Sequence, residues 1–247
     1  MNDVFYSSIG RYYNYIFPYN PDKKKFTKSL LESPDDSTLL DIGCSTGDLP
    51  LELAKDGNSV YAIDSEHEMI NQAIRKKMPL ELDEYPVFRY LDMRRIAHFF
   101  DKRKFDAITC YGNTLVHLNN KEEISDFLNS CNEVLRTKGH LMIQILNYEY
   151  ILKENIRKLP VIDNDKVRFE RYYEHTDTEY LDFITRLTIK DDQSVLKNRI
   201  PLYPLSKKQL YELLSHSGFS DIKFYGGFNK APFQENGLPL LVEAIKQ

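Results

Sequence analysis

The chain has 247 residues, of which 42% are apolar and 28% are charged, the ordinary mixture of a globular protein. Its net charge of -4 and its scattered basic residues argue against a nucleic acid partner. Cys44, Cys110 and Cys131 have neither metal-binding nor disulfide spacing, no signal peptide is recognisable, and no apolar run is long enough for a membrane span. We therefore expect a cytoplasmic protein with no metal site and no membrane partner.

The first part of the chain alternates short apolar strands with amphipathic helices. Residues 39–47 read as a strand that enters a glycine-containing turn, and residues 49–56 as a helix ended by Gly57. Ser65 with Glu68, and Asn120 with Glu123, have the spacing that opens a helix, and Gly139 is expected to stop the second of these helices. Further strands are predicted at residues 59–63, 87–91, 105–111 and 141–146. This alternation predicts a parallel sheet with helices on both faces.

The pattern changes after Asn147. Residues 167–175, 180–190 and 194–203 alternate like strands without intervening helices, which predicts an antiparallel insertion that serves as a lid or a dimer surface. A capping box of Ser206 and Gln209 then opens another helix. A final pair of strands, at residues 222–228 and 240–245, completes a mostly parallel seven-stranded sheet.

The predicted domain organisation follows from this change of pattern. A main α/β domain comprises residues 1–147 and 204–247, and the insertion comprises residues 148–203. Residues 1–38 are expected to form a helical cap, whose aromatic segment 5–17 contains Tyr6, Tyr12, Tyr13 and Tyr15 and is predicted to be a helix.

Carboxylates stand at the ends of three successive predicted strands. Asp41 precedes the turn Gly43-Cys44-Ser45-Thr46-Gly47, Asp64 ends the second strand and Asp92 ends the third. Open α/β sheets bind ligands at the carboxyl ends of their strands, and glycines in the first turn allow the backbone to approach the ligand closely. A single such aspartate would be read as a cap, but three in succession predict a ligand site.

Two other chemistries are compatible with parts of this turn. A dinucleotide site would need a third glycine where Asp48 stands, and a carboxylate there would repel pyrophosphate. Gly43 to Gly47 also matches G-x-S-x-G, which would make Ser45 the nucleophile of an α/β-hydrolase with His216 as its histidine. The turn follows the first strand and no HGGG-type segment is present, so the hydrolase is the weaker alternative.

With these residues identified, the sequence resembles the class I S-adenosylmethionine-dependent methyltransferases, which have a Rossmann-like sheet. Residues 39–47 resemble the family's first motif, with Ser45 in place of its middle glycine, and residues 63–65 and 91–94 resemble its ribose-binding and adenine-binding loops. The resemblance implies S-adenosyl-L-methionine as the cofactor. The cofactor-binding residues that it implies are Tyr13, Asp41, Gly43, Cys44, Ser45, Gly47, Asp64, Ser65, Met69, Asp92, Met93 and Tyr111.

A narrower resemblance concerns the acceptor. Residues 111–118 and 147–152 are similar to segments of glycine and sarcosine N-methyltransferases, which implies methylation of a small molecule, at nitrogen before other atoms. Asn113 is then predicted to orient the acceptor, with His117 as a candidate base, and the pocket is predicted to include Tyr148 and Tyr150. In that family a basic residue precedes the Asn-Tyr pair and meets the substrate carboxylate, but here the position is Leu146. A catalytically silent cofactor-binding regulator stays open as an alternative, as does a homodimer formed through the insertion.

Overall fold

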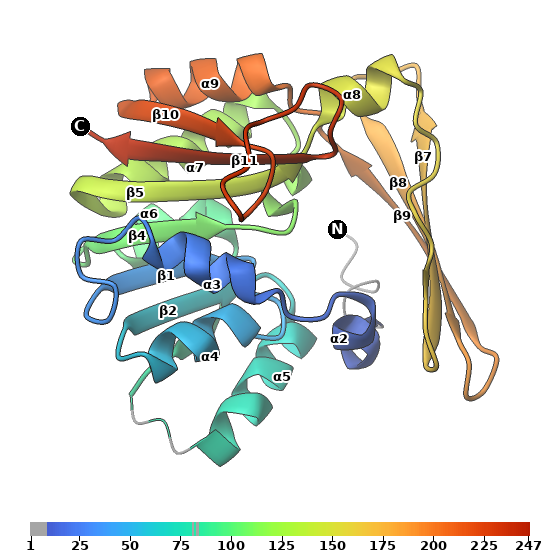
Figure 1. Cartoon of the computed structure of the whole chain (residues 1–247), viewed down its shortest axis with the longest axis horizontal. Helices are drawn as coiled ribbons and strands as arrows, with labels where there is room; N and C mark the ends of the chain where they lie inside the picture. The colour runs from blue at the N-terminus through green and yellow to red at the C-terminus, as the bar shows by residue number, and fades with distance from the viewer. Residues whose placement is uncertain (1–8, 81, 83) are drawn as a thin grey trace.

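The computed structural model describes residues 9–80, 82 and 84–247. Its main sheet has seven strands in the order β10-β11-β5-β4-β1-β2-β3, and β11 runs antiparallel to both of its neighbours whereas the other pairs are parallel. The predicted mostly parallel seven-stranded sheet is therefore confirmed (Figure 1). The strands are β1 (Thr38–Ile42), β2 (Ser59–Asp64), β3 (Val87–Tyr90), β4 (Phe105–Cys110), β5 (Leu135–Leu146), β10 (Phe219–Tyr225) and β11 (Pro239–Lys246).

Helices cover both faces of this sheet because successive side chains of each strand point in opposite directions. In β2, Val60 and Ala62 pack in the clusters that contain residues of α4 and α5, whereas Tyr61 and Ile63 join the cluster that contains residues of α7 and α9. No helix in the described part of the chain is long and apolar enough to cross a membrane. The helices are η1 (Gly10–Tyr12), α2 (Tyr13–Ile16), α3 (Pro21–Lys28), α4 (Asp48–Lys55), α5 (His67–Lys77), η2 (Met78–Leu80), η3 (Met93–Arg95), α6 (Ile96–Phe99), η4 (Thr114–His117), α7 (Lys121–Val134), α8 (Tyr148–Lys153) and α9 (Lys207–His216).

The insertion after β5 is a second, antiparallel sheet, as the alternation in the sequence predicts, but it has four strands because the short strand β6 was not predicted. Its order is β6-β7-β8-β9. The face that carries Leu181 and Leu187 is buried in the same apolar core as the main sheet. Figure 1 shows the short helix α2 beside this sheet, and the Asn164 side chain of the insertion donates to the Tyr15 carbonyl of α2 at 2.8 Å. The strands are β6 (Ile162–Asp163), β7 (Val167–His175), β8 (Leu181–Ile189) and β9 (Val195–Leu202).

Three local predictions are wrong. Gly139 does not stop a helix: α7 ends at Val134 and Gly139 lies within β5, whose first residue already pairs with β4. Ser65 does not cap α5, because the Asp64 carboxylate takes the Glu66 N–H and the helix begins at His67. The N-terminal segment is the short pair η1 and α2 instead of one helix over 5–17, although residues 5–8, including Tyr6, lie outside the described part. By contrast, the Ser206–Gln209 capping box is confirmed in both directions.

Candidate active site

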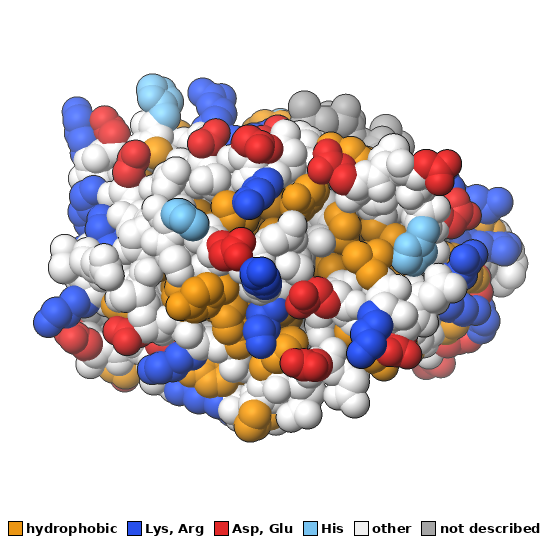
Figure 2. All heavy atoms as spheres, turned by 90° about the horizontal axis from the view of Figure 1, so that it is seen from above, with side chains coloured by type: hydrophobic (Ala, Val, Ile, Leu, Met, Phe, Trp, Pro, Cys, Tyr) orange, Lys and Arg blue, Asp and Glu red, His pale blue; other side chains and the backbone are white. Residues whose placement is uncertain are grey.

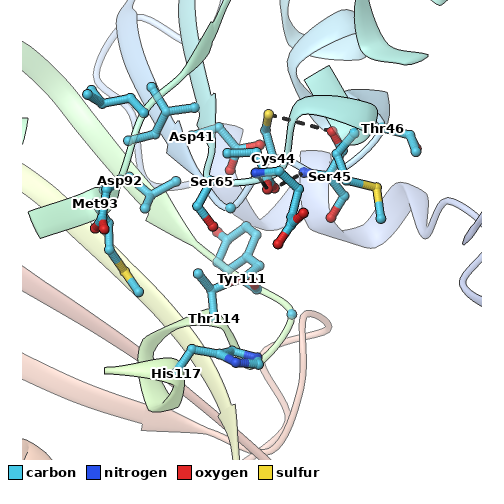
Figure 3. A pocket seen from close by; sticks show the side chains of 18 of the residues that line it. Asp41, Cys44, Ser45, Thr46, Ser65, Asp92, Met93, Tyr111, Thr114 and His117 are labelled. Carbon is cyan, nitrogen blue, oxygen red and sulfur yellow. Dashed lines mark hydrogen bonds between the residues drawn. The ribbon is translucent and has the colours of Figure 1, made fainter. Parts of the chain in front are cut away.

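A cavity of about 740 Å³ lies at the carboxyl ends of β1, β2, β3 and β4. Its other walls come from the N-terminal segment and from the end of β9, so the insertion closes one side of it. This volume is within the range of small-molecule sites. Figure 3 shows the labelled side chains around this space. Of the residues predicted from the sequence, the lining includes Tyr13, Asp41, Gly43, Cys44, Ser45, Asp64, Ser65, Met69, Asp92, Met93, Tyr111 and His117.

Asp64 is bound to the turn that follows β1. Its Oδ2 accepts the Ser45 N–H at 2.8 Å, and its Oδ1 accepts the Glu66 N–H at 3.0 Å. Burial raises the pKa of Asp64 to about 6, against the backbone hydrogen bonds, which lower it. The carboxylate has lone pairs beyond those two bonds, so it can accept further hydrogen bonds from a ligand in the cavity.

Asp41 lies deeper and faces a lysine that the sequence analysis did not identify. Thr109 Oγ1 donates to Asp41 Oδ1 at 2.6 Å, and burial raises the pKa of Asp41 to about 7. Lys23 of α3 lines the same cavity, and burial lowers its pKa although Asp41 and Asp48 oppose that shift. No local sequence motif marks Lys23 as a site residue. It reaches the strand ends only through the fold of the N-terminal segment. The site thus has a partly exposed lysine that interacts electrostatically with its carboxylates.

Asp92 is held by the arginine that follows it. Arg94 Nη2 donates to Asp92 Oδ2 at 2.7 Å, and the Arg94 N–H is capped by Asp92 Oδ1 at 2.9 Å. Partial burial raises the pKa of Asp92, but these bonds from Arg94 outweigh it, so the net shift is downward. The carboxylate is consequently ionised at neutral pH.

The N-terminal segment is joined to the same turn by polar contacts. Ser45 Oγ donates to Tyr13 Oη at 2.9 Å, and burial raises the pKa of Tyr13 to about 12. Asn14 Nδ2 donates to Asp48 Oδ2 at 2.9 Å, and Lys76 Nζ contacts Asp48 Oδ1 at 2.7 Å. Asp48 therefore has a neutralising partner, and its part in the turn is to connect α2 and α5 to the start of α4.

Several predicted site residues lie outside the cavity lining. Gly47 is required for packing, because a Cβ there would come within 2.7 Å of Ala73 Cβ and of the Phe88 ring. Asn113 Nδ2 donates to Tyr148 Oη at 2.7 Å, and Asn113 Oδ1 accepts the Leu146 N–H at 3.0 Å. Tyr148 is fully buried.

The hydrogen bond between Asn113 and Tyr148 explains the positions of both side chains without a bound methyl acceptor. The bond joins the loop after β4 to α8, so its evident contribution is to fix that loop. Tyr150, on the same helix, does not line the cavity either. The structure thus gives no direct support to the acceptor contacts predicted for these three residues.

The hydrolase alternative does not match the geometry. Ser45 Oγ has the Tyr13 hydroxyl as its partner, whereas His216 lies on α9, exposed, with its ring nitrogen 2.6 Å from the Glu212 carbonyl oxygen. His117 is the histidine that lines the cavity, and burial lowers its pKa to about 4. It is therefore uncharged at neutral pH and a weak base.

Two residues of the insertion also reach the cavity. Ile200 and Pro201, at the end of β9, form part of its lining. The sequence pattern placed both residues in the insertion, but only the packing of the two sheets shows that the insertion contributes to the site. The lining beyond the predicted residues also includes Tyr19, Lys23, Thr46, Thr114 and Asn119.

Comparisons with known proteins agree with this arrangement. Residues 39–139 match a family model described as a methyltransferase domain. A glycine/sarcosine N-methyltransferase of Aphanothece halophytica is 29% identical over 215 residues, which span 85% of this chain and 76% of that protein.

Two solved structures show the same fold over nearly the whole chain. The CcbJ methyltransferase of Streptomyces caelestis superposes with a TM-score of 0.85 at 15% identity and full coverage of both chains. The sugar N-methyltransferase KedS8 of Streptoalloteichus sp ATCC 53650 has a TM-score of 0.71 at 14% identity, with 96% and 92% covered.

Proposed function

We propose that this chain, an S-adenosylmethionine-dependent methyltransferase, transfers the methyl group to a nitrogen atom of a small-molecule acceptor. The observation that carries the proposal is the single cavity that contains the three strand-end carboxylates and, beside them, His117 and the insertion residues Ile200 and Pro201. One end of the cavity suits the cofactor and the other suits an acceptor.

The residues at the strand ends fit the cofactor. Asp64 can accept the two ribose hydroxyls, Asp92 can accept from the adenine amino group, and Lys23 can pair with the carboxylate of the amino-acid end. The cofactor supplies a methyl group on a positively charged sulfur. The protein's contribution is to bind, to orient the acceptor and to exclude water, which is sufficient because the leaving group is already activated.

A nitrogen acceptor is supported by the relatives and by the chemistry of the cavity. The Aphanothece halophytica protein and KedS8 are both named as N-methyltransferases. An amine must lose its proton before it can attack, and desolvation in a partly closed cavity favours the neutral form. Uncharged His117 can accept a hydrogen bond from the amine, while the released proton leaves through water because a histidine with a pKa of about 4 holds it weakly.

Glycine and sarcosine are expected to be poor acceptors. The position that is basic in the resembling family is Leu146, whose backbone is held in β5 by Pro239 and by Asn113. A leucine cannot pair with a carboxylate adjacent to the reacting nitrogen, and an unpaired carboxylate in a partly dry site is costly.

An acceptor screen tests the proposal. The protein is incubated with methyl-labelled cofactor and matched amines, phenols and thiols, and the methylated atom is identified by mass spectrometry and NMR. We expect N-methyl products. Products methylated only at oxygen or sulfur would refute the nitrogen proposal and leave the methyltransferase assignment in place.

Two further predictions concern the environment of the enzyme. A homodimer through the insertion is testable by sedimentation equilibrium, and a cytoplasmic location by fractionation of cells that express the chain.

Figure 2 shows acidic and basic side chains intermingled over the face that it presents, which is consistent with the expectation of a small-molecule partner instead of a nucleic acid.

A further inference from the structure

Three polar residues form a row across the inner face of the insertion sheet. Arg171 of β7 pairs in register with Thr185 of β8, and Thr185 pairs with Asn198 of β9. Directly paired residues on one face have Cβ atoms about 5 Å apart. The three side chains are therefore neighbours, although they lie far apart in the sequence. We call them the polar row.

The rest of this face is apolar. Along β8 the residues two positions away from Thr185 are Phe183 and Leu187, and both belong to the core that the insertion shares with the main sheet. Along β7 the corresponding residues are Phe169 and Tyr173, which are buried in the same core. The polar row is thus set into an otherwise hydrophobic surface.

Each member of the polar row has a buried polar atom without a hydrogen-bond partner. These atoms are Arg171 Nε, Thr185 Oγ1 and Asn198 Nδ2. Arg171 uses Nη2 to donate to the Pro160 carbonyl at 2.8 Å, which fixes its guanidinium, and Thr185 has no exposed surface. A buried polar atom without a partner costs free energy, so three in one row are unfavourable for the fold by itself.

None of the three residues lines the cavity itself, but the polar row has neighbours that line it or contact its lining. Ile200, which lines the cavity, is two residues from Asn198 on the same face of β9, about 7 Å along the strand. Phe17, another lining residue, contacts the ring of Phe169, which is two residues from Arg171, at 5.8 Å between ring centroids. The row therefore lies behind the part of the cavity wall that Ile200 forms.

From these observations we infer that Arg171, Thr185 and Asn198 form a subsite for an anionic group, a carboxylate or its equivalent, on the acceptor. Arg171 Nε and Asn198 Nδ2 are donors and Thr185 can donate as well, so the matching ligand group is a hydrogen-bond acceptor with negative charge. Because the row lies beyond Ile200, this group is several bonds from the nitrogen. The inference rests on the proposed function and adds an acceptor class to it: amines with a distant carboxylate.

The test uses ω-amino acids of three to eight carbons and the corresponding alkylamines. Binding to the enzyme loaded with S-adenosylhomocysteine is measured by calorimetry, and methylation is measured separately. We expect at least one ω-amino acid to bind ten times more tightly than its alkylamine. Arg171→Gln should remove that preference and leave cofactor affinity and alkylamine binding within twofold of wild type.

Matched controls come from the opposite face of the insertion sheet, on β8. Arg186 is exposed and Thr188 is half-buried, so Arg186→Gln and Thr188→Val make the same chemical changes away from the polar row and should leave the preference intact. Thr185→Val provides a second readout. It should weaken binding of the ω-amino acid while leaving the unfolding temperature equal or higher, because the hydroxyl has no partner to lose.

The outcomes separate the two proposals. If amines are methylated but no ω-amino acid is preferred, or if Arg171→Gln weakens both ligand types equally, the anionic subsite is refuted and the nitrogen proposal stands. If ω-amino acids bind through Arg171 but no amine is methylated, the subsite stands and the nitrogen proposal fails. A clear loss of unfolding temperature in Thr185→Val would show a structural role for the hydroxyl and would refute the argument for the subsite.

Discussion

Replacing Asp64 by alanine tests the proposed cofactor site most directly. The change removes the acceptor of the Ser45 and Glu66 N–H groups, which lie 2.8 and 3.0 Å from the carboxylate. It also removes the group expected to accept the ribose hydroxyls. We expect cofactor affinity to fall at least tenfold, which corresponds to about 1.4 kcal/mol or more. Because the half-buried backbone groups lose their acceptor as well, the free energy of unfolding should fall by about 1–3 kcal/mol.

The control variant is Asp106→Ala. Asp106 also accepts a backbone N–H, that of Thr38 at 2.8 Å, but it lies at the start of β4, at the edge of the sheet opposite the cavity. Both variants should lose stability, and only Asp64→Ala should lose affinity. Affinity is measured by titration calorimetry and stability by urea unfolding. A folded Asp64→Ala protein that binds the cofactor as tightly as wild type would refute the proposed role of this carboxylate.

Four further predictions concern the turn, the packing and the titrating groups. Ser45 has a positive φ of 50°. Ser45→Gly should therefore relieve strain of about 1–2 kcal/mol and lose one hydrogen bond of about 1 kcal/mol, so that unfolding and cofactor binding stay close to wild type. Labelling of wild-type Ser45 by a fluorophosphonate would contradict this. Gly43→Ala should destabilise by about 2 kcal/mol or more, because its Cβ would come within 2.4 Å of Thr114 Oγ1 at a positive φ; an unchanged urea midpoint would contradict it. The pKa values of Asp41 and Asp64 are raised to about 7 and about 6, so the folded protein binds protons at these groups more tightly than the unfolded chain does. The ligand-free protein should therefore gain stability from them as pH falls from 7.5 toward 4. Asp41→Asn should reduce this gain in thermal unfolding. His117, with its pKa lowered to about 4, should remain neutral down to about pH 5 in an NMR titration, and an inflection near 6.5 would show that its imidazole is solvated.

The local pattern of the chain was sufficient for the strands of the main sheet, for three of the four strands of the insertion and for the main carboxylates. Strand period and turn residues place Asp41, Asp64 and Asp92 at strand ends, and a parallel sheet brings such ends to one edge whatever the details of packing. The capping box of Ser206 and Gln209 was equally predictable, because its two hydrogen bonds join residues only three positions apart.

Contacts between distant segments were decided only by the tertiary structure. The bond between Asn113 and Tyr148 joins two residues that were predicted to contact the acceptor, and α3 brings Lys23 to Asp41. Gly139 lies in β5 because pairing with the neighbouring strands outweighs the local tendency of glycine to end a helix. The polar row depends on the register of three strands, since a shift of one residue would turn these side chains to the other face. Sequence periodicity specifies which residues alternate, whereas register, and with it the neighbours of each polar group, is set by how the sheets pack against each other.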